Sequence, residues 1–341
     1  MASTGAVTDC LNTCLLCMQT AITEIQSSPL QDKDSVCKAG DSFDTFAVAR
    51  KEAILRTVVS EKSRLPSFKD VVGLDEAKRA LQEALIDPIT YPEWFAFSDL
   101  KPWRCVLLFG PPGNGKTHLA KSIAAELDSR FYVVSSSDLI STWSGQSEKM
   151  IRELFDDALG FDGVSIIFID EVDSLCRKRC SNEEDGNRRI KTELLLQLQR
   201  LYCSGNKTVL ICATNCPWDL DTAFLRRFEK KIYVGLPTLE SRKMLLKKLI
   251  SVSLKFCEKN IDWDFFAHST EGFSGDDIRR LAREIAFLQF RKYKEKRLNF
   301  SRTVEVKIEQ ICVNANEFSD VLKQFDRSLD IDTLNRFADF K

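Results

Sequence analysis

The sequence predicts an α/β fold in which a five-stranded parallel sheet with flanking helices is followed by a smaller helical domain. From Phe68 onward, amphipathic helical patterns alternate with short, β-branched apolar runs bounded by turn residues, a pattern typical of parallel sheets. After Pro237 the apolar runs stop and helical periodicity continues alone. The 341 residues suffice for about two domains. With 44% apolar and 29% charged residues, the chain can bury a substantial core.

The expected strands are runs that are apolar almost throughout, as strands buried on both faces should be. They cover 105–109, 131–134, 165–169, 209–213 and 231–234. Helical patterns cover 7–25, 50–64, 118–127, 239–254, 276–294 and 316–326, and Pro66 should end the second of these. We therefore expect an N-terminal appendage and linker over 1–64, a large α/β domain over 65–236, and a small helical domain with a C-terminal helix over 237–341.

The charge balance argues against several classes of partner. Forty-nine Lys and Arg residues face 50 Asp and Glu residues, so a net charge of -1 gives no general attraction to nucleic acid or anionic membrane. The longest apolar runs, such as 166–169, are far shorter than the roughly 20 residues of a membrane-spanning helix. The N-terminus lacks the pattern of a secretory signal. We expect an intracellular, cytoplasmic protein.

The cysteines and histidines offer little for metal or nucleophilic chemistry. Cys10, Cys14 and Cys17 match an iron–sulfur spacing, but they also fall on one face of a short amphipathic helix, which we prefer. Only His118 and His268 are present, so histidine metal sites and Ser-His or Cys-His pairs have almost no material. The chemistry must come from other residues.

A phosphate-binding loop is predicted directly after the first strand. Residues 110–117 read GPPGNGKT and precede a helical pattern, which is the context that the G-x4-G-K-[ST] motif requires. Glycines let backbone N–H groups approach phosphates, while Lys116 reaches the β and γ oxygens and the Thr117 hydroxyl can bind Mg²⁺. The alternative is a Gly/Pro turn beside a surface lysine. The predicted nucleotide-binding residues here are Gly110, Pro111, Pro112, Gly113, Asn114, Gly115, Lys116, Thr117 and His118.

Two further strands end in polar residues suited to hydrolysis. The run SIIFI is followed by Asp170, a candidate Mg²⁺ ligand, and Glu171, which would polarise an attacking water. Such an acidic pair can also cap a helix. The next strand is followed by Asn215, whose amide could orient the water or the γ-phosphate. Because parallel strands present their carboxyl ends at one edge, these residues should meet the phosphate loop.

These motifs resemble the AAA ATPases of the group containing spastin, katanin, fidgetin and the ATPase that disassembles ESCRT-III. GPPGNGKT, IIFIDEVDSL, ATNCPWDLD, LRRFEKKIYV and EGFSGDDI occur in that order, and the resemblance runs from about Phe68 to Phe340. It implies an AAA module with a helical lid that works as a ring hexamer with ATP between subunits. It also implies that Lys116, Thr117, Asp170, Glu171 and Asn215 keep the family's phosphate, metal, water and sensor roles.

The same resemblance assigns roles to residues whose types alone would say little. Arg226 and Arg227 match arginine fingers that reach a neighbouring subunit, although an Arg pair is also common at solvated helix ends. Gly272, Ser274 and Gly275 match the start of the lid helix, where Ser274 is also a plausible helix cap. Trp143 matches the pore aromatic that grips a peptide, or else it is a core anchor. Arg188 and Arg189 match the second pore loop, or they form a solvated basic turn.

The family resemblance leaves the substrate open between two protein polymers. Microtubule severing, as in spastin and katanin, is our leading hypothesis because 291–307 is a short basic segment where the ESCRT-III disassembler carries an inserted β-domain. ESCRT-III disassembly in endosomal trafficking is the alternative, and the protein would accordingly associate with the cytoskeleton or with endosomes. A nucleotide-binding ring adaptor without useful turnover is the alternative of another class.

Overall fold

The computed structural model describes residues 41–59, 65–97, 100–141, 147–178, 185–253, 262–299, 315–325 and 327–340. By its internal contacts the chain divides into two units, Met1–Ala49 and Arg50–Lys341. The sheet and every site residue discussed below belong to the second unit. The helical pattern at 7–25, with its three cysteines, and the pore candidate Trp143 lie outside the described residues.

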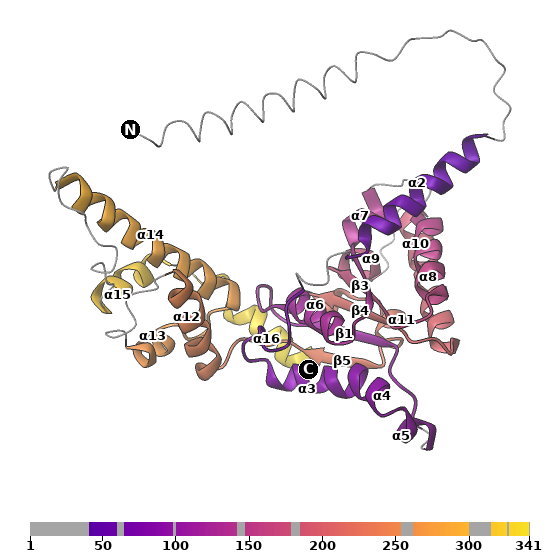
Figure 1. Ribbon diagram of the computed structural model, residues 1–341, viewed down its shortest axis with the longest axis horizontal. Coiled ribbons are helices and arrows are strands. Elements are labelled where there is room, and N and C mark those ends of the chain that lie inside the picture. Colours follow the sequence, from indigo (N-terminus) through magenta and orange to yellow (C-terminus); the bar gives the residue numbers. More distant parts are fainter. Residues whose placement is uncertain are drawn as a thin grey trace, which may run out of the picture. The chain divides into compact units, whose positions relative to one another are not determined.

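Five parallel strands form the predicted sheet, in the order β2-β3-β4-β1-β5 (Figure 1). Their bounds differ from the predicted runs by no more than one residue at either end: β1 Cys105–Phe109, β2 Arg130–Ser135, β3 Ser165–Asp170, β4 Thr208–Thr214 and β5 Lys230–Tyr233. All residues of β1 and β4 are buried, as predicted, whereas β5 leaves Lys231 exposed. The difference follows from position, because β5 is an edge strand.

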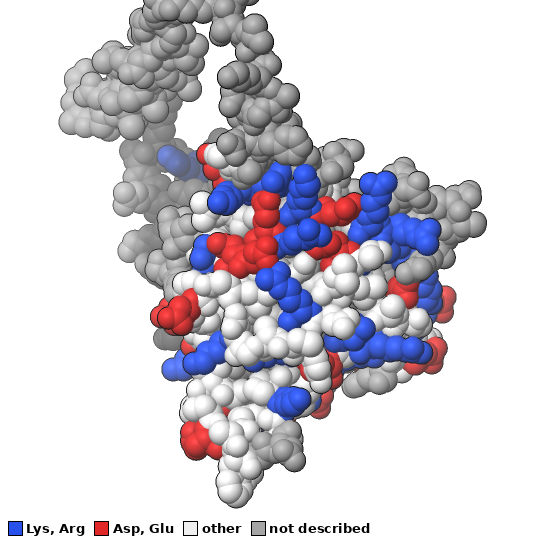
Figure 2. All heavy atoms as spheres, turned by 90° about the vertical axis from the view of Figure 1, so that its right-hand side faces the viewer, with Lys and Arg blue, Asp and Glu red and all other residues white. Residues whose placement is uncertain are grey.

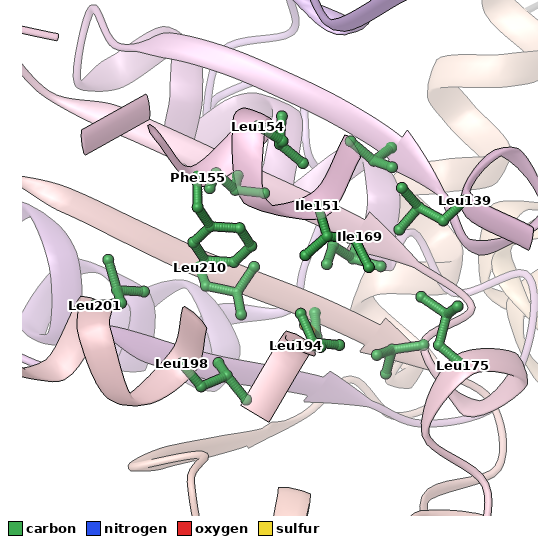
Figure 3. Close-up of a cluster of buried hydrophobic side chains, with 14 of the residues drawn as sticks. Leu139, Ile151, Leu154, Phe155, Ile169, Leu175, Leu194, Leu198, Leu201 and Leu210 are labelled. Atoms are coloured by element: carbon green, nitrogen blue, oxygen red, sulfur yellow. The ribbon is translucent and has the colours of Figure 1, made fainter. Parts of the chain in front are cut away.

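Helices cover both faces of the sheet and create two apolar layers. On one face, α8 (Ser147–Gly160) and α10 (Asp185–Cys203) pack onto the sheet through side chains such as Phe155, Leu194 and Leu210 (Figure 3). On the other face lie α3 (Asp75–Leu81) and α6 (Lys116–Glu126). This three-layer arrangement covers the faces of the sheet and leaves the ends of its strands open to ligands.

Shorter elements connect these layers. Thr57 ends α2 (Asp41–Thr57), and the remaining bounds are η2 Gln82–Ile86, α4 Asp87–Thr90, α5 Pro92–Phe97, α7 Ser136–Ser141, α9 Asp173–Cys176, η3 Pro217–Asp219 and α11 Thr222–Leu225. On the face that carries α8 and α10, basic and acidic side chains are interspersed (Figure 2), with ion pairs such as Arg152–Glu193. None of the described helices combines the length and apolar character that a membrane crossing requires.

A separate group of helices follows the sheet and has its own core. It comprises α12 (Leu239–Ser253), α13 (Trp263–Ser269), α14 (Gly275–Asn299) and α15 (Ala315–Lys323), packed around buried residues such as Phe266 and Phe318. We call these four helices the lid. The sequence predicts a helix as far as residue 294 within this region, and α14 continues beyond it through residues 295–299 of the expected basic connection. Lys, Glu and Arg, which make up most of this segment, have high helix propensity, and this propensity explains why the helix continues.

The last helix does not join the lid core. In α16 (Ile331–Phe340), the ring of Phe337 lies 4.9 Å from that of Trp218, and the ring of Phe340 lies 5.2 Å from that of Phe109. The chain therefore returns from the lid to the sheet. We expect a C-terminal helix within the small domain over 237–341, and that expectation does not specify the surface that the helix covers.

The N-terminal boundary also differs from the expected one. Arg50 makes an ion pair of 2.7 Å with Glu153 of α8, and Val58 forms a β-bridge with Tyr132 of β2. Residues 50–59 thus pack with the sheet rather than forming part of an appendage that ends at Arg64. The division after residue 236 remains a proposal, supported by the separate lid core.

Asp277 ties the start of the lid helix α14 to the returning chain. Its fully buried carboxylate accepts hydrogen bonds from the Ser274 amide and hydroxyl, from Ser328 Oγ at 2.8 Å and from Arg280 at 2.6 Å. Burial alone would raise the pKa of Asp277, but these donors lower it below 3.8. The carboxylate consequently stabilises the fold above that pH and loses this contribution as the pH falls further.

We expect Asp277→Ala to lower the free energy of unfolding by about 2–4 kcal/mol, because several buried donors lose their acceptor. Thermal and urea unfolding at pH 7 measure the loss. Asp320→Ala is the control, because Asp320 forms an exposed ion pair with Lys323, and such pairs contribute less than about 1 kcal/mol. Equal melting of the Asp277 variant and the wild type would contradict the assignment.

Candidate active site

One cavity of 830 Å³ opens where β1, β3 and β4 end and where the lid meets the sheet. Its lining includes Asp170 of β3, residues that follow β1 and β4, and residues of the lid helices α12 and α14. The predicted residues among them are Pro112, Gly113, Asn114, Gly115, Lys116, Thr117, His118, Asp170, Glu171, Asn215 and Gly275. Lys116 and Asp170 therefore face the same space. Sheet topology explains this convergence, because β4 pairs with both β1 and β3.

The loop after β1 has a backbone conformation at residue 113 that favours glycine. Its φ is +76°, and a Cβ there would lie 2.9 Å from the Asp276 side chain. The Gly113 carbonyl accepts a hydrogen bond of 2.9 Å from the Asp276 amide, and Asn114 Oδ1 accepts one of 3.2 Å from the Gly275 amide. The start of the lid helix thus contacts the loop backbone directly, and a side chain at this position would separate them.

Lys116 is an almost fully buried cation, and no carboxylate of the described residues lies in hydrogen-bond contact with it. Only 7% of the residue is exposed, and Nζ donates to the carbonyls of Gly110 at 2.8 Å and Pro111 at 3.0 Å. Burial lowers the pKa of Lys116 from 10.5 to about 8, while the charge of Asp170 partly opposes the shift. Neutral carbonyls compensate a buried ammonium incompletely, so an anion entering the cavity would bind it more strongly.

Thr117 and the two acids form a connected group beside Lys116. Thr117 Oγ1 donates to Asp170 Oδ2 at 2.6 Å, and the Glu171 amide donates to Asp170 Oδ1 at 3.0 Å. Among the residues that the structure describes, the carboxylate of Glu171 makes no hydrogen bond or ion pair, and it lines the cavity. One acid is therefore held in place while the other remains available to a ligand or a water molecule.

Asn215 adds a neutral polar group at the end of β4. Its Oδ1 is buried without a hydrogen-bond partner, and the residue lines the cavity. The preceding Thr214 hydroxyl donates to Asp173 Oδ1 at 2.7 Å, so the end of β4 is fastened to α9. A buried amide oxygen without a donor is costly, which fits a site that receives a ligand or water.

The predicted lid residues divide into those that line the cavity and those that shape the helix start. Gly275 lines the cavity, whereas Gly272 and Ser274 do not. Gly272 has a φ of +78°, and Ser274 Oγ accepts a bond of 3.1 Å from the Asp277 amide, which confirms the helix-cap interpretation.

Sequence reasoning missed the far end of the cavity. It did predict His118, which lines the cavity, and burial together with the charges of Lys248 and Lys121 lowers the pKa of this imidazole below 6.5. The residues that it missed are apolar or lid residues outside the predicted set: Val71, Val72, Leu74, Leu245, Lys248, Leu249, Asp276 and Arg279. Of these, Asp276 lies within the EGFSGDDI motif.

The remaining candidates lie away from this cavity. Arg226 and Arg227 are exposed and line a different hollow of 490 Å³ beside α10, together with residues such as Leu195. Arg188 and Arg189 are exposed near the start of α10 and do not line the cavity either. Within this chain the structure brings none of these four arginines to Lys116.

Comparison with known proteins places these observations in a family. Residues 106–236 match the ATPase family associated with various cellular activities, abbreviated AAA.

Three curated relatives share 42–46% identity with this chain. Protein SUPPRESSOR OF K(+) TRANSPORT GROWTH DEFECT 1 of Arabidopsis thaliana is 44% identical over 76% of this chain and 59% of its own length. Vacuolar protein sorting-associated protein 4A of Homo sapiens is 46% identical over 71% and 55%. Katanin p60 ATPase-containing subunit A1 of Arabidopsis thaliana is 42% identical over 70% and 47%.

The chain thus spans between about half and three fifths of these relatives. Among solved structures, the AAA domain of FIGL-1 in complex with ADP is 31% identical, with a TM-score of 0.72, over 90% of this chain and 98% of that domain. Katanin, one member of the predicted group, is thus among the relatives. On the shared sequence, the shared fold and the motif residues around one cavity, the chain belongs to the AAA family of ATPases.

Proposed function

We propose that the protein hydrolyses ATP in a ring of identical subunits and uses the reaction to pull on a protein polymer. The observation that carries this proposal is the cavity that Lys116, Thr117, Asp170, Glu171 and Asn215 share with the lid. Lys116 and the backbone amides of the glycine-rich loop would bind the phosphates. Family membership supports nucleotide binding in this cavity.

The residues present also fit a magnesium ion. Thr117 Oγ1 and Asp170 Oδ2 lie 2.6 Å apart, and hydroxyl and carboxylate oxygens are ligands that Mg²⁺ accepts. These two side chains would hold the ion, which supplies positive charge beside the phosphates. Glu171 would orient a water molecule and take its proton, and Asn215 would position the water or the terminal phosphate. Among the described residues, the Glu171 carboxylate makes no hydrogen bond and Asn215 Oδ1 has no partner, so both groups are available to bind water or phosphate.

Assembly would complete the site. Arg226 and Arg227 are exposed and lie outside the cavity, as residues that serve a neighbouring subunit must be. Arginine supplied in trans can raise hydrolysis by about 10³–10⁵-fold. In the proposed ring, Trp143, Arg188 and Arg189 would line the pore that grips the polymer.

Microtubule severing is the substrate hypothesis that we favour. Helix α14 ends at Asn299 and α15 begins at Ala315, so residues 300–314 leave little chain for an inserted domain. ESCRT-III disassembly is the second candidate, supported by 46% identity to vacuolar protein sorting-associated protein 4A. Either substrate implies a cytoplasmic protein at the cytoskeleton or at endosomes.

Hydrolysis should depend on two neighbouring subunits. Glu171→Gln alone should bind ATP without turnover, and Arg227→Ala alone should turn over at least about 100-fold more slowly than the wild type. Mixtures of the two variants should recover part of the activity, because some interfaces then pair an intact Glu171 with an intact Arg227. Phosphate release at several mixing ratios measures this.

Rates in the mixtures that merely average those of the separate variants would contradict action in trans. Phosphate release that stays near zero in the wild type, even as its concentration rises, would instead support an adaptor without useful turnover.

Nucleotide affinity should fall as the pH rises through about 8. Phosphates favour the charged form of Lys116, whose pKa burial has lowered to about 8, so binding above that pH requires uptake of a proton. Fluorescent-nucleotide titrations from pH 6.5 to 9.5 should show up to about a tenfold loss per pH unit above 8. Lys116→Arg is the control, because a guanidinium stays charged and should remove the slope. A flat profile in the wild type up to pH 9.5 would be incompatible with this assignment.

The substrate is tested by offering both polymers. With ATP and Mg²⁺, the protein should fragment stabilised microtubules in a fluorescence assay, and Glu171→Gln should not. Disassembly of ESCRT-III filaments with intact microtubules would overturn the severing hypothesis and favour the second candidate.

A further inference from the structure

The backbone of Glu171 adopts an unfavourable conformation. Its φ is +53°, in the left-handed region that residues with a Cβ seldom occupy. Such conformations persist where surrounding contacts determine them, and they are frequent at functional sites. The contacts that hold the Glu171 backbone in this conformation therefore also determine the direction in which its carboxylate points.

Three donors converge on the carbonyl oxygen of Glu171. Two come from Ser174 in the same turn, the amide and the hydroxyl, each at 3.0 Å. The third is Ser136 Oγ at 2.9 Å, which also lies 2.8 Å from the carbonyl oxygen of Asp170. One buried hydroxyl thus spans the carbonyls of both acidic residues.

Ser136 reaches these carbonyls from a different part of the chain. It is 1% exposed and begins α7, directly after β2, which pairs in parallel with β3 so that Ser135 lies opposite Asp170. A serine at a helix start usually accepts a hydrogen bond from the helix's own amides. Ser136 Oγ instead has a neighbouring strand's carbonyls as its partners, so helix capping does not account for it.

The peptide between the two acids is held from both sides. On one side, the carbonyl of Asp170 accepts a hydrogen bond from the Ser136 hydroxyl. On the other side, the amide of Glu171 donates to Asp170 Oδ1 at 3.0 Å. The other carboxylate oxygen of Asp170, Oδ2, accepts a hydrogen bond from the Thr117 hydroxyl. A rotation of this peptide would therefore move the carboxylate of Glu171 and strain the Thr117–Asp170 contact.

We propose that Ser136 is a positioning residue for hydrolysis: its hydroxyl fixes the peptide between Asp170 and Glu171 and thereby aims the Glu171 carboxylate into the cavity. This inference rests on the proposed function of Glu171 as the group that activates water. In the part of the chain that the structure describes, the hydrogen bonds of the Ser136 hydroxyl go to the carbonyls of Asp170 and Glu171, not to Lys116 or the glycine-rich loop. Its loss should affect the hydrolysis step and leave nucleotide binding nearly unchanged.

The test compares Ser136→Ala with Ser136→Thr, which keeps a hydroxyl, and with Ser137→Ala as the matched control. Ser137 lies in the same helical turn but is exposed. We expect Ser136→Ala to lower kcat about 3- to 10-fold, the effect of one hydrogen bond. Its KM, its affinity for a fluorescent ADP analogue and its melting temperature should match those of Ser137→Ala, and Ser136→Thr should recover most of the lost rate.

The possible results distinguish a failure of the Ser136 positioning role from a failure of the proposed catalytic role of Glu171. If Glu171→Gln abolishes turnover while Ser136→Ala hydrolyses like Ser137→Ala, the positioning role is refuted and the proposed function stands. A Ser136→Ala variant that loses nucleotide affinity or melting temperature in parallel with kcat also refutes it, since that is a general structural defect. Normal turnover in Glu171→Gln would remove the proposed catalytic role itself, whatever the serine variants do.

Discussion

The hydrogen bond between Thr117 and Asp170 joins the two halves of the site. Thr117 belongs to the helix after β1, and Asp170 ends β3, while β4 lies between these strands in the sheet. The bond therefore depends on parallel pairing across three strands with the correct register. A slip of one residue would turn alternate side chains to the other face of the sheet and separate the two residues. The apolar runs that bury the sheet thus also determine the geometry of the polar site.

The lid adds a second constraint, because it contacts the loop that would bind phosphate. The amides of Gly275 and Asp276 donate to Asn114 and Gly113, and Asp277 fastens this helix start to Ser328 of the returning chain. A change in the loop can therefore reach the lid through backbone hydrogen bonds. Helix α16 packs on the sheet beyond that point, so the lid is connected to the sheet at both of its ends.

Much of the sheet and most of the loop residues that line the cavity after β1 could be predicted from the sequence, because both depend on local patterns. Strands such as Cys105–Phe109 combine β-branched or apolar residues with adjacent turns, and GPPGNGKT restricts the loop conformation strongly. The far end of the cavity could not be predicted. Val71, Leu245 and Lys248 come from segments distant in the sequence and have no motif in common. The return of α16 was missed for the same reason, since Phe337 would read equally well as lid core. The left-handed backbone of Glu171 has no signal at all in its residue type.

Our central proposal is that Lys116 would bind the terminal phosphate of ATP, while Thr117 and Asp170 would hold the metal ion beside it. A structure of the assembled protein with Mg²⁺, ADP and beryllium fluoride, a mimic of that phosphate, tests it most directly. The account predicts that Lys116 Nζ leaves the carbonyls of Gly110 and Pro111 for the fluoride, that the metal contacts the Thr117 hydroxyl, and that Arg226 or Arg227 of a neighbouring subunit approaches the same group. A nucleotide bound outside this cavity, or one that leaves Lys116 on those carbonyls, would contradict it.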